Sequence, residues 1–287
     1  MTLQKVWPLN QLRQQLPAGF LADSRWFADH GISRSRVHDY VKNGWLERVG
    51  PRVYRRLEGP HDASELRWEI AVLSAQANQP LPLHIGGPTA LDLLGLSHFL
   101  DLGRKTRIWL YDPSRTAPPW LDKLPTDVEL SINRRKLFGN AQLGLEWRPL
   151  ELTTGRVGPS IDPPPPVEFW QHVMRLSGPE RATLEMLDDV GKIVGFNSAD
   201  KLFEGLANLR PALLLDLLQQ CTSVKTKRLF FFFSDRHRHA WAKRIDPTRV
   251  DLGSGKRQIV KGGRLDPKYQ ITVPAEFLED SEDPNAG

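Results

Sequence analysis

Near the amino end of the chain, apolar residues recur with the period of a helix over residues 33–42. They follow an i, i+3, i+4 spacing that places them on one face: Val37, Tyr40 and Val41. Gly31 is expected to end a preceding helix, and the Ser33 hydroxyl to cap this one. The pattern therefore predicts two short helices joined by a tight turn, the second with a polar outer face.

The next residues, WLERVGPRVYRR (45–56), predict a hairpin with strands at 45–49 and 53–56 and a Gly-Pro-Arg turn between them. Helix, glycine turn, polar-faced helix and basic hairpin are typical of a winged helix-turn-helix, whose second helix enters the DNA major groove. We expect residues 1–60 to form this DNA-binding domain. A small helical domain with a solvated basic face, or a winged helix used for protein contact, fits the same pattern.

Polar residues of the second helix and the hairpin are the candidates for DNA contact. Those near the start of the helix are placed for base edges, which carry sequence information: Ser35, Arg36 and Asp39, with His38 beside them. Basic residues further along are placed for phosphates, which fix the register on DNA without reading its sequence: Lys42, Arg52, Arg55 and Arg56.

The middle of the chain predicts mixed α and β structure. Residues 62–78 read as a helix with one apolar face, and residues 86–96 as a short capped helix. Strands are predicted at 106–112, 127–133 and 143–152. The proline run in SIDPPPPVEFW (160–170) predicts an extended break between subdomains, which we place at 61–166 and 167–287.

The carboxy-terminal part predicts mainly helices, at 178–190, 198–209 and 210–221. The phenylalanine-rich segment 223–236 is expected in the core, as either strand or helix, because its periodicity does not distinguish them. A short helix at 237–245 and a closing hairpin of 257–263 with 268–274, turning at Gly262-Gly263, complete the prediction. The expected fold class is α+β, with an acidic tail at 276–287.

Charge is unevenly distributed along the chain. Residues 1–60 carry ten Lys/Arg and five Asp/Glu, a net charge of +5, and residues 221–275 carry thirteen and four, a net charge of +9. Residues 61–220 between them carry sixteen and twenty, a net charge of −4. Two basic ends around an acidic middle favour nucleic acid as a partner. The single cysteine excludes an internal disulfide and fits a reducing cytoplasm.

The stretch DLGSGKRQIVKGGRLDPKYQITVP (251–274) places glycines beside lysine, as nucleotide-binding loops do. A phosphate-binding loop needs a glycine five residues before its Gly-Lys pair and a hydroxyl residue after it. Here those positions hold Val250 and Arg257. We therefore interpret the glycines as turn formers and the basic residues as surface.

Other catalytic patterns are incomplete. His237 and His239 have no further cysteine or histidine set to complete a zinc site, and Cys221 has no nucleophile motif. A metal-dependent nuclease needs a carboxylate two positions before a lysine on a strand. Asp127 and Glu129 precede Ser131 instead of lysine, and Asp266-Pro267-Lys268 contains a proline that interrupts strands: neither set completes the motif. We expect no cofactor and no metal.

Two parts of the sequence resemble the AbiEi family of antitoxins. GISRSRVHDYVKNGWLERVGPRVYRR is similar to its amino-terminal winged-helix domain. SGPERATLEMLDDV, FEGLANLRPALL and residues 223–274 resemble its carboxy-terminal antitoxin domain, which would occupy residues 61–287 here. The resemblance implies a cytoplasmic antitoxin of the AbiE phage-defence type that lacks enzymatic activity. It would bind inverted repeats in its own promoter, two copies per operator, and repress the operon.

The resemblance also implies a partner and a second basic surface. The partner is a nucleotidyltransferase-type toxin, AbiEii, counteracted either directly or through its target. A positive surface on the carboxy-terminal domain supports repression in the family, which points to Lys225, Lys227, Arg228, Lys256, Arg257 and Lys261. The alternatives that stay open are a stand-alone winged-helix regulator and the metal-dependent nuclease.

Overall fold

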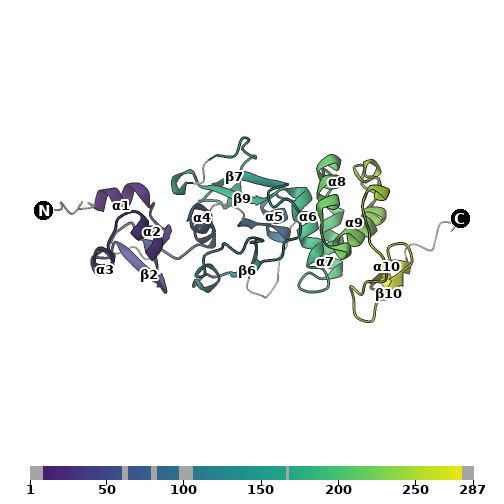
Figure 1. Ribbon diagram of the computed structural model, residues 1–287, viewed down its shortest axis with the longest axis horizontal. Helices are drawn as coiled ribbons and strands as arrows, with labels where there is room; N and C mark the ends of the chain where they lie inside the picture. Colours follow the sequence, from purple (N-terminus) through teal and green to yellow (C-terminus); the bar gives the residue numbers. More distant parts are fainter. Residues whose placement is uncertain (1–8, 60–63, 79–82, 97–105, 166–167, 280–287) are drawn as a thin grey trace. The chain divides into compact units, whose positions relative to one another are not determined.

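The computed structural model describes residues 9–59, 64–78, 83–96, 106–165 and 168–279 (Figure 1). It divides into two compact units: unit 1 draws on residues 1–84, 101–134 and 146–175, and unit 2 on residues 85–100, 135–145 and 176–287. The fold is α+β, as the sequence predicts, with a winged helix-turn-helix first, a mixed region next and a mainly helical carboxy-terminal part last. The domain boundary at residue 60 and the subdomain boundary at 166 stay predictions.

The winged helix-turn-helix forms the amino-terminal part of unit 1. Its elements are α1 (Leu9–Gln15), β1 (Leu21–Asp23), α2 (Ser24–Asp29), α3 (Arg34–Lys42), β2 (Leu46–Gly50) and β3 (Val53–Arg56). The three strands pair antiparallel in the order β1-β3-β2, so the predicted hairpin of β2 and β3 gains β1 as an edge strand. Because β1 is three residues long, no periodicity in the sequence marks it.

Local caps fix where the two helices of this module begin and end. The Asp23 carboxylate accepts the backbone N–H groups of Arg25 and Trp26 at the start of α2. Gly31 follows α2 with φ = 73°, a left-handed conformation that glycine adopts without strain. The Ser33 hydroxyl then accepts the Arg36 N–H and caps α3, as predicted.

The middle of the chain forms a six-stranded sheet in the order β6-β5-β4-β9-β7-β8. Strands β5 and β6 pair in parallel, as do β4 and β9, whereas β7 and β8 are antiparallel. The strands are β4 (His84–Ile85), β5 (Arg107–Tyr111), β6 (Glu129–Asn133), β7 (Leu145–Glu151), β8 (Arg156–Val157) and β9 (Val173–Ser177). The three predicted strands match β5, β6 and β7. The described part of the proline run, residues 160–165, is irregular.

Helix α4 (Trp68–Asn78) differs from the expected helix with one apolar face. Every residue from Glu69 to Gln76 is buried, so the helix is covered on all sides. Its polar side chains are satisfied inside the fold. The Gln76 amide donates to the Arg175 carbonyl at 2.8 Å and accepts the Arg175 N–H at 2.9 Å. The Ser74 hydroxyl accepts the Leu21 N–H at 3.0 Å, which ties β1 to α4.

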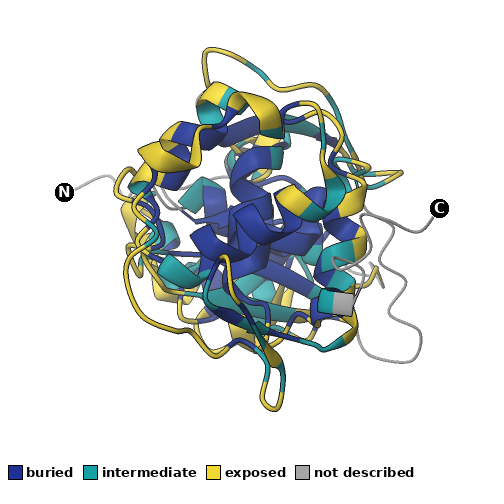
Figure 2. Cartoon of the chain, turned by 90° about the vertical axis from the view of Figure 1, so that its right-hand side faces the viewer, coloured by how far each residue is buried: buried dark blue, intermediate teal, exposed yellow. Residues whose placement is uncertain are grey.

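Unit 2 is built mainly from helices around an aromatic core. Figure 2 shows that the segments at the centre of the view are buried, whereas those at its edge are mostly exposed. The helices of unit 2 are α5 (Gly87–Leu93), α6 (Pro179–Asp188), α7 (Phe196–Glu204), α8 (Pro211–Gln220), α9 (Val224–His237) and α10 (Glu276–Glu279). Helix α9 contains the phenylalanine-rich segment, so the ambiguity between strand and helix is resolved as helix. Its nine residues from Thr226 to Ser234 are all buried, which confirms the core prediction.

The predicted closing hairpin is present with a different partner strand. Strand β10 (Arg264–Asp266) pairs with β11 (Ile271–Val273), and the turn lies at residues 267–270 and not at Gly262-Gly263. The Asp266 carbonyl accepts the Gln270 N–H at 3.0 Å, and Pro267 occupies the turn, where it has no N–H to leave unpaired. The predicted helix at 237–245 shrinks to a 3₁₀ turn at Ala242–Arg244.

A buried carboxylate joins several segments of unit 2. The Asp188 side chain is 2% exposed, and Arg135 Nη1 donates to both of its oxygens at 2.7 Å. Ser223 and Thr226, at the start of α9, donate their hydroxyls at 2.8 and 3.0 Å. Burial alone would raise the pKa of Asp188, but the Ser223 hydrogen bond and the charge of Arg135 outweigh it and leave the pKa below its usual value.

We expect Asp188→Asn to lower the free energy of unfolding by about 1.5–3 kcal/mol at neutral pH, because a neutral amide weakens the charge-assisted hydrogen bonds from Arg135, Ser223 and Thr226. A carboxylate whose pKa is lower in the folded state stabilises the fold above its unfolded-state pKa, near 3.8. That stabilisation is lost as the pH falls through the lower folded-state value. Urea unfolding of the wild type and of Asp188→Asn should show a difference in unfolding free energy at pH 7. This difference should become smaller below pH 3.8.

The control is Asp216→Asn, which changes an exposed carboxylate on α8. This variant should unfold within about 0.5 kcal/mol of the wild type. A pH-independent difference between Asp188→Asn and the wild type would contradict the assigned charge state.

Candidate nucleic-acid interface

Helix α3 presents the polar face that the sequence predicts. Val37 and Tyr40 are each 6% exposed and fix the helix on the module. Burial raises the pKa of the Tyr40 phenol, and the positive charge of Arg36 only partly offsets this. The predicted contact residues lie on the remaining sides, where Arg36 is half-buried and the others are exposed: Ser35, His38, Asp39 and Lys42. Five predicted residues therefore share one helix.

The wing also presents basic side chains. Arg52 is exposed at the turn between β2 and β3, with φ = 62°, and its carbonyl accepts the Ser24 N–H at 2.9 Å. Two further exposed arginines were missed by sequence reasoning, Arg34 at the start of α3 and Arg48 on β2. The helical period places Arg34 on the side of Val37 and Val41, so the apolar pattern gave no signal that Arg34 is exposed.

Arg55 and Arg56 do not lie where the sequence suggested. Each is 5% exposed, because they belong to β3, the central strand of the three-stranded sheet. Arg55 pairs with Glu47 at 2.8 Å and donates to the Ser64 carbonyl at 2.6 Å. Arg56 donates to the Leu57 carbonyl at 3.3 Å. Both guanidinium groups serve the fold, so they are not presented to phosphates.

The predicted basic residues of the carboxy-terminal part also fall into an exposed group and a buried or half-buried group. Lys256, Arg257 and Lys261 are exposed, whereas Lys227 and Arg228 are 6% and 4% exposed. Lys225 is half-buried, and its ammonium donates to the Asp188 and Val190 carbonyls at 2.5 and 2.8 Å. Burial lowers the pKa of Lys225 to about 8.

The hydrogen bonds of Arg228 account for the glycines in the loop at residues 251–256. Its guanidinium donates to the carbonyls of three loop residues, at 2.6 to 3.0 Å: Leu252, Gly253 and Gly255. Gly253 and Gly255 both have positive φ, which lets the loop turn its carbonyls toward one side chain. A phosphate-binding loop directs N–H groups at its ligand. This loop directs carbonyls at an arginine.

Several of the residues weighed for metal chemistry have other partners. His237 Nε2 lies 2.7 Å from the Asp200 carboxylate, and His239 Nε2 lies 2.9 Å from the Phe203 carbonyl. Glu129 pairs with Arg107 at 3.0 Å. Lys268 pairs with Asp235, beside the turn of the closing hairpin. Among the described residues, no three His, Cys, Asp or Glu side chains are grouped to hold a metal ion.

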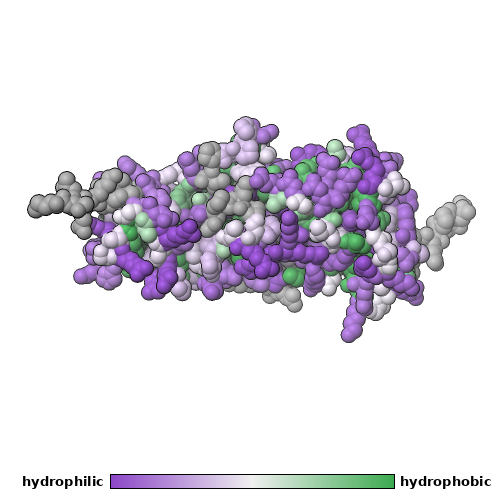
Figure 3. All heavy atoms as spheres, in the orientation of Figure 1, coloured by the Kyte–Doolittle hydropathy of each residue, from purple (hydrophilic) through white to green (hydrophobic). Residues whose placement is uncertain are grey.

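Cys221 ends α8 and is buried, as its position after an apolar helix predicts. Burial raises the pKa of its thiol to about 11, which keeps it protonated and unreactive as a nucleophile at neutral pH. Hydrophilic residues cover most of the face shown in Figure 3. No helix in the described ranges is long and apolar enough to span a membrane.

Two family models match consecutive parts of the chain. Residues 6–102 match the AbiEi antitoxin N-terminal domain of transcriptional regulators. Residues 105–274 match the model described as transcriptional regulator, AbiEi antitoxin, type IV toxin–antitoxin system. No curated protein matches the chain significantly.

A solved structure, that of the RV2827C protein from Mycobacterium tuberculosis, has a similar fold. Its TM-score is 0.54 at 14% sequence identity, over 92% of this chain and 90% of that one. Likeness at this identity concerns the fold alone. The two family models, in contrast, cover most of the sequence in the expected order, and the chain belongs to the AbiEi family of type IV antitoxin transcriptional regulators.

Proposed function

We propose that this AbiEi regulator binds inverted repeats in its own promoter, represses its operon and counteracts a nucleotidyltransferase-type toxin. The exposed polar face of α3 carries the DNA-binding part of the proposal, because a capped helix followed by a basic wing is the geometry that reads a major groove. Family membership supports the toxin partner. Two copies per operator follow from the symmetry of inverted repeats.

The arrangement assigns different roles to different side chains. Ser35, Arg36 and Asp39 lie in the first turns of α3, where side chains reach base edges. Lys42 and Arg52 lie at the end of α3 and on the wing, where they reach phosphates. Arg34 and Arg48 join the phosphate set because they are exposed. Arg55 and Arg56 leave it because they are buried.

A second basic surface supports the repressor role. Lys256, Arg257 and Lys261 are exposed around the loop that Arg228 organises, and we propose them as additional phosphate contacts. Lys225, Lys227 and Arg228 are buried or half-buried in unit 2, so we assign them to stability.

We expect Arg36→Ala to lower operator affinity by about 1–3 kcal/mol while leaving binding to random DNA nearly unchanged, because a base contact contributes only at the right sequence. Fluorescence anisotropy with operator and scrambled duplexes measures both affinities. Equal losses on the two duplexes would show that Arg36 contacts phosphate and not bases.

We expect Arg52→Ala to weaken binding to all duplexes alike and to reduce the slope of log affinity against log salt by about 0.9 for each lost phosphate contact. Arg156→Ala is the matched control, since Arg156 is an exposed arginine on β8, outside the winged helix. An unchanged slope in Arg52→Ala would remove Arg52 from the phosphate set.

We expect co-expression of this chain to restore growth to cells that produce the nucleotidyltransferase encoded beside it. We propose that the carboxy-terminal antitoxin domain, and not the winged helix, neutralises the toxin. The Arg36→Ala/Arg52→Ala variant, expressed from an unrelated promoter, should therefore rescue growth as well. Growth curves measure the effect. Failure of the wild type to rescue, with the protein present on an immunoblot, refutes the antitoxin role for this pair.

A further inference from the structure

The turn at the tip of the wing carries an arginine where the backbone conformation favours glycine. Pro51 and Arg52 form the two-residue connection between β2 and β3, and the residues on either side of it, Gly50 and Val53, pair with each other. The proline ring fixes φ of Pro51 at about −65°. The positive φ of 62° therefore falls on Arg52, the second residue of the turn. This is the pattern of a type II turn, in which glycine or asparagine normally holds that position.

The left-handed conformation of Arg52 costs free energy that a glycine would avoid, because the β-carbon crowds the following carbonyl. Strained residues of this kind persist where the surrounding structure holds them in place, and they are concentrated at functional sites. Arg52 is exposed, and within the described part of the chain its guanidinium group has no hydrogen-bond or ion-pair partner. No contact of the side chain inside the described fold offsets the strain, which points to a partner outside the protein.

The backbone of Arg52 is held by the first residue of α2. The Ser24 N–H donates to the Arg52 carbonyl at 2.9 Å, and the Ser24 hydroxyl donates to the same oxygen at 3.4 Å. This contact extends the β1–β3 ladder by one residue, since the last pair of that ladder is Asp23 with Val53. The turn is thus fixed by a strand and a helix that lie outside the hairpin.

The same contact also satisfies the start of α2. The first N–H groups of a helix have no partner within the helix. The Asp23 carboxylate accepts those of Arg25 and Trp26, and the Arg52 carbonyl accepts that of Ser24. The start of α2 and the tip of the wing therefore depend on each other. Because α2 leads directly into α3, the wing tip and the base-reading helix share one support.

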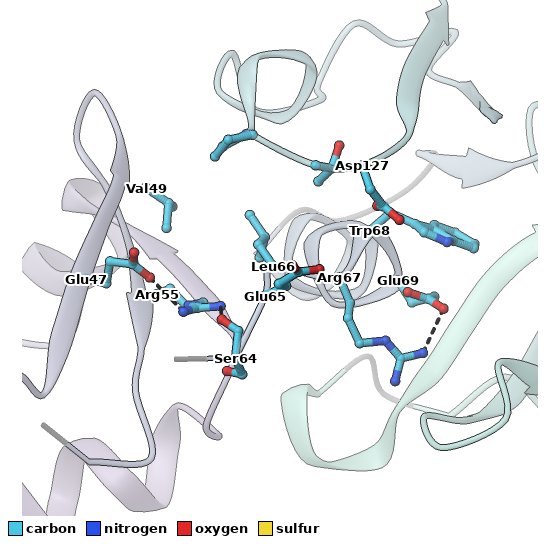
Figure 4. Close-up of a pocket in the computed structure, with 12 residues that line it drawn as sticks. Glu47, Val49, Arg55, Ser64, Glu65, Leu66, Arg67, Trp68, Glu69 and Asp127 are labelled. Carbon is cyan, nitrogen blue, oxygen red and sulfur yellow. Dashed lines mark hydrogen bonds and ion pairs between the residues drawn. The ribbon is translucent and has the colours of Figure 1, made fainter. Parts of the chain in front are cut away.

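Other contacts fix the base of the wing. Arg55 on β3 pairs with Glu47 on β2 at 2.8 Å and donates to the Ser64 carbonyl at 2.6 Å (Figure 4). These side chains line a cavity of about 670 Å³ in unit 1. Arg55 is buried there, whereas Arg52 is exposed at the tip. The contact with Ser24 thus acts on the wing arginine that DNA can reach.

We propose that the Ser24 N–H positions Arg52 for DNA binding. It holds the wing turn in the conformation that presents the guanidinium group to a phosphate at a fixed distance from the bases that α3 contacts. Ser24 is a positioning residue, because it acts through Arg52. The inference rests on the proposed function, to which it adds the element that keeps the wing contact in register with the helix contacts.

Ser24→Pro tests this role, because it removes the N–H and preserves the helix. Proline is well tolerated at the first position of a helix. Asp23 before it already has the extended conformation that a following proline requires, with φ = −97° and ψ = 172°. We expect Ser24→Pro to weaken binding to operator and random duplexes alike and to reduce the slope of log affinity against log salt by about 0.9. Ser24→Ala, the matched control, keeps the N–H and should keep the wild-type slope.

The Arg52→Gly background separates positioning from general damage to the domain. Because the guanidinium group is already absent there, adding Ser24→Pro should leave both the affinity and the slope of Arg52→Gly nearly unchanged. An unchanged slope in Ser24→Pro alone, or an equal loss of affinity with and without Arg52, overturns the positioning role and leaves the proposed function standing. A wild type that binds no operator duplex refutes the proposed function, and this inference with it.

Two measurements do not depend on folding of the proline variant. Hydrogen exchange of the wild type should be slower, relative to intrinsic rates, at the Ser24 amide than at that of Arg34, which begins α3 and for which the described structure shows no acceptor. Equal protection of the two amides overturns the contact. Arg52→Gly should unfold in urea at the wild-type midpoint or above it, because glycine adopts positive φ without strain. A lower midpoint would show that the Arg52 side chain supports the fold, and overturns its assignment to DNA.

Discussion

The need to neutralise cations inside the fold governs which basic residues this protein can offer to a partner. An arginine or lysine removed from water is costly unless carboxylates or carbonyls replace its hydration. Arg181 meets this need with Glu185, and Arg228 with the carbonyls of the glycine-rich loop. Both arginines also hold loop backbone in place, because Arg181 donates to the Ala141 and Leu143 carbonyls and Arg228 to those of the glycine-rich loop. Only the basic residues left outside these networks are available to bind DNA.

The winged helix-turn-helix was readable from sequence because its determinants are local. A serine cap, a three-residue apolar stripe and a turn with glycine and proline each act within a few positions of the chain. The burial of Arg55 could not be predicted from the sequence, since its partners, Glu47 and the Ser64 carbonyl, lie on the neighbouring strand and in the segment before α4. The hairpin at the carboxy end was misplaced for a similar reason. Both glycine and proline turns were available there, and tertiary pairing selected the proline turn.

The face of α3 and the cavity differ in how far the sequence alone predicts them. The face of α3 was predicted because helical period determines which residues point outward. The cavity shown in Figure 4 was not predicted, because its lining comes from three separate segments of unit 1. No spacing between residues 47, 65 and 127 could indicate that they line one cavity. Surfaces carried by one element can be read from sequence, and surfaces assembled from several elements need the fold.

Net charge along the sequence therefore overstates the surface available to nucleic acid. Residues 221–275 carry thirteen Lys/Arg, of which nine are exposed. The four others, Lys225, Lys227, Arg228 and Arg236, lie on α9, where they are held by contacts within unit 2 or packed against its core. A salt slope counts phosphates that are contacted, not charges in the sequence. The glycine-rich stretch contains residues of both kinds. Its carbonyls accept hydrogen bonds from the buried Arg228, whereas its own Lys256 and Arg257 are exposed.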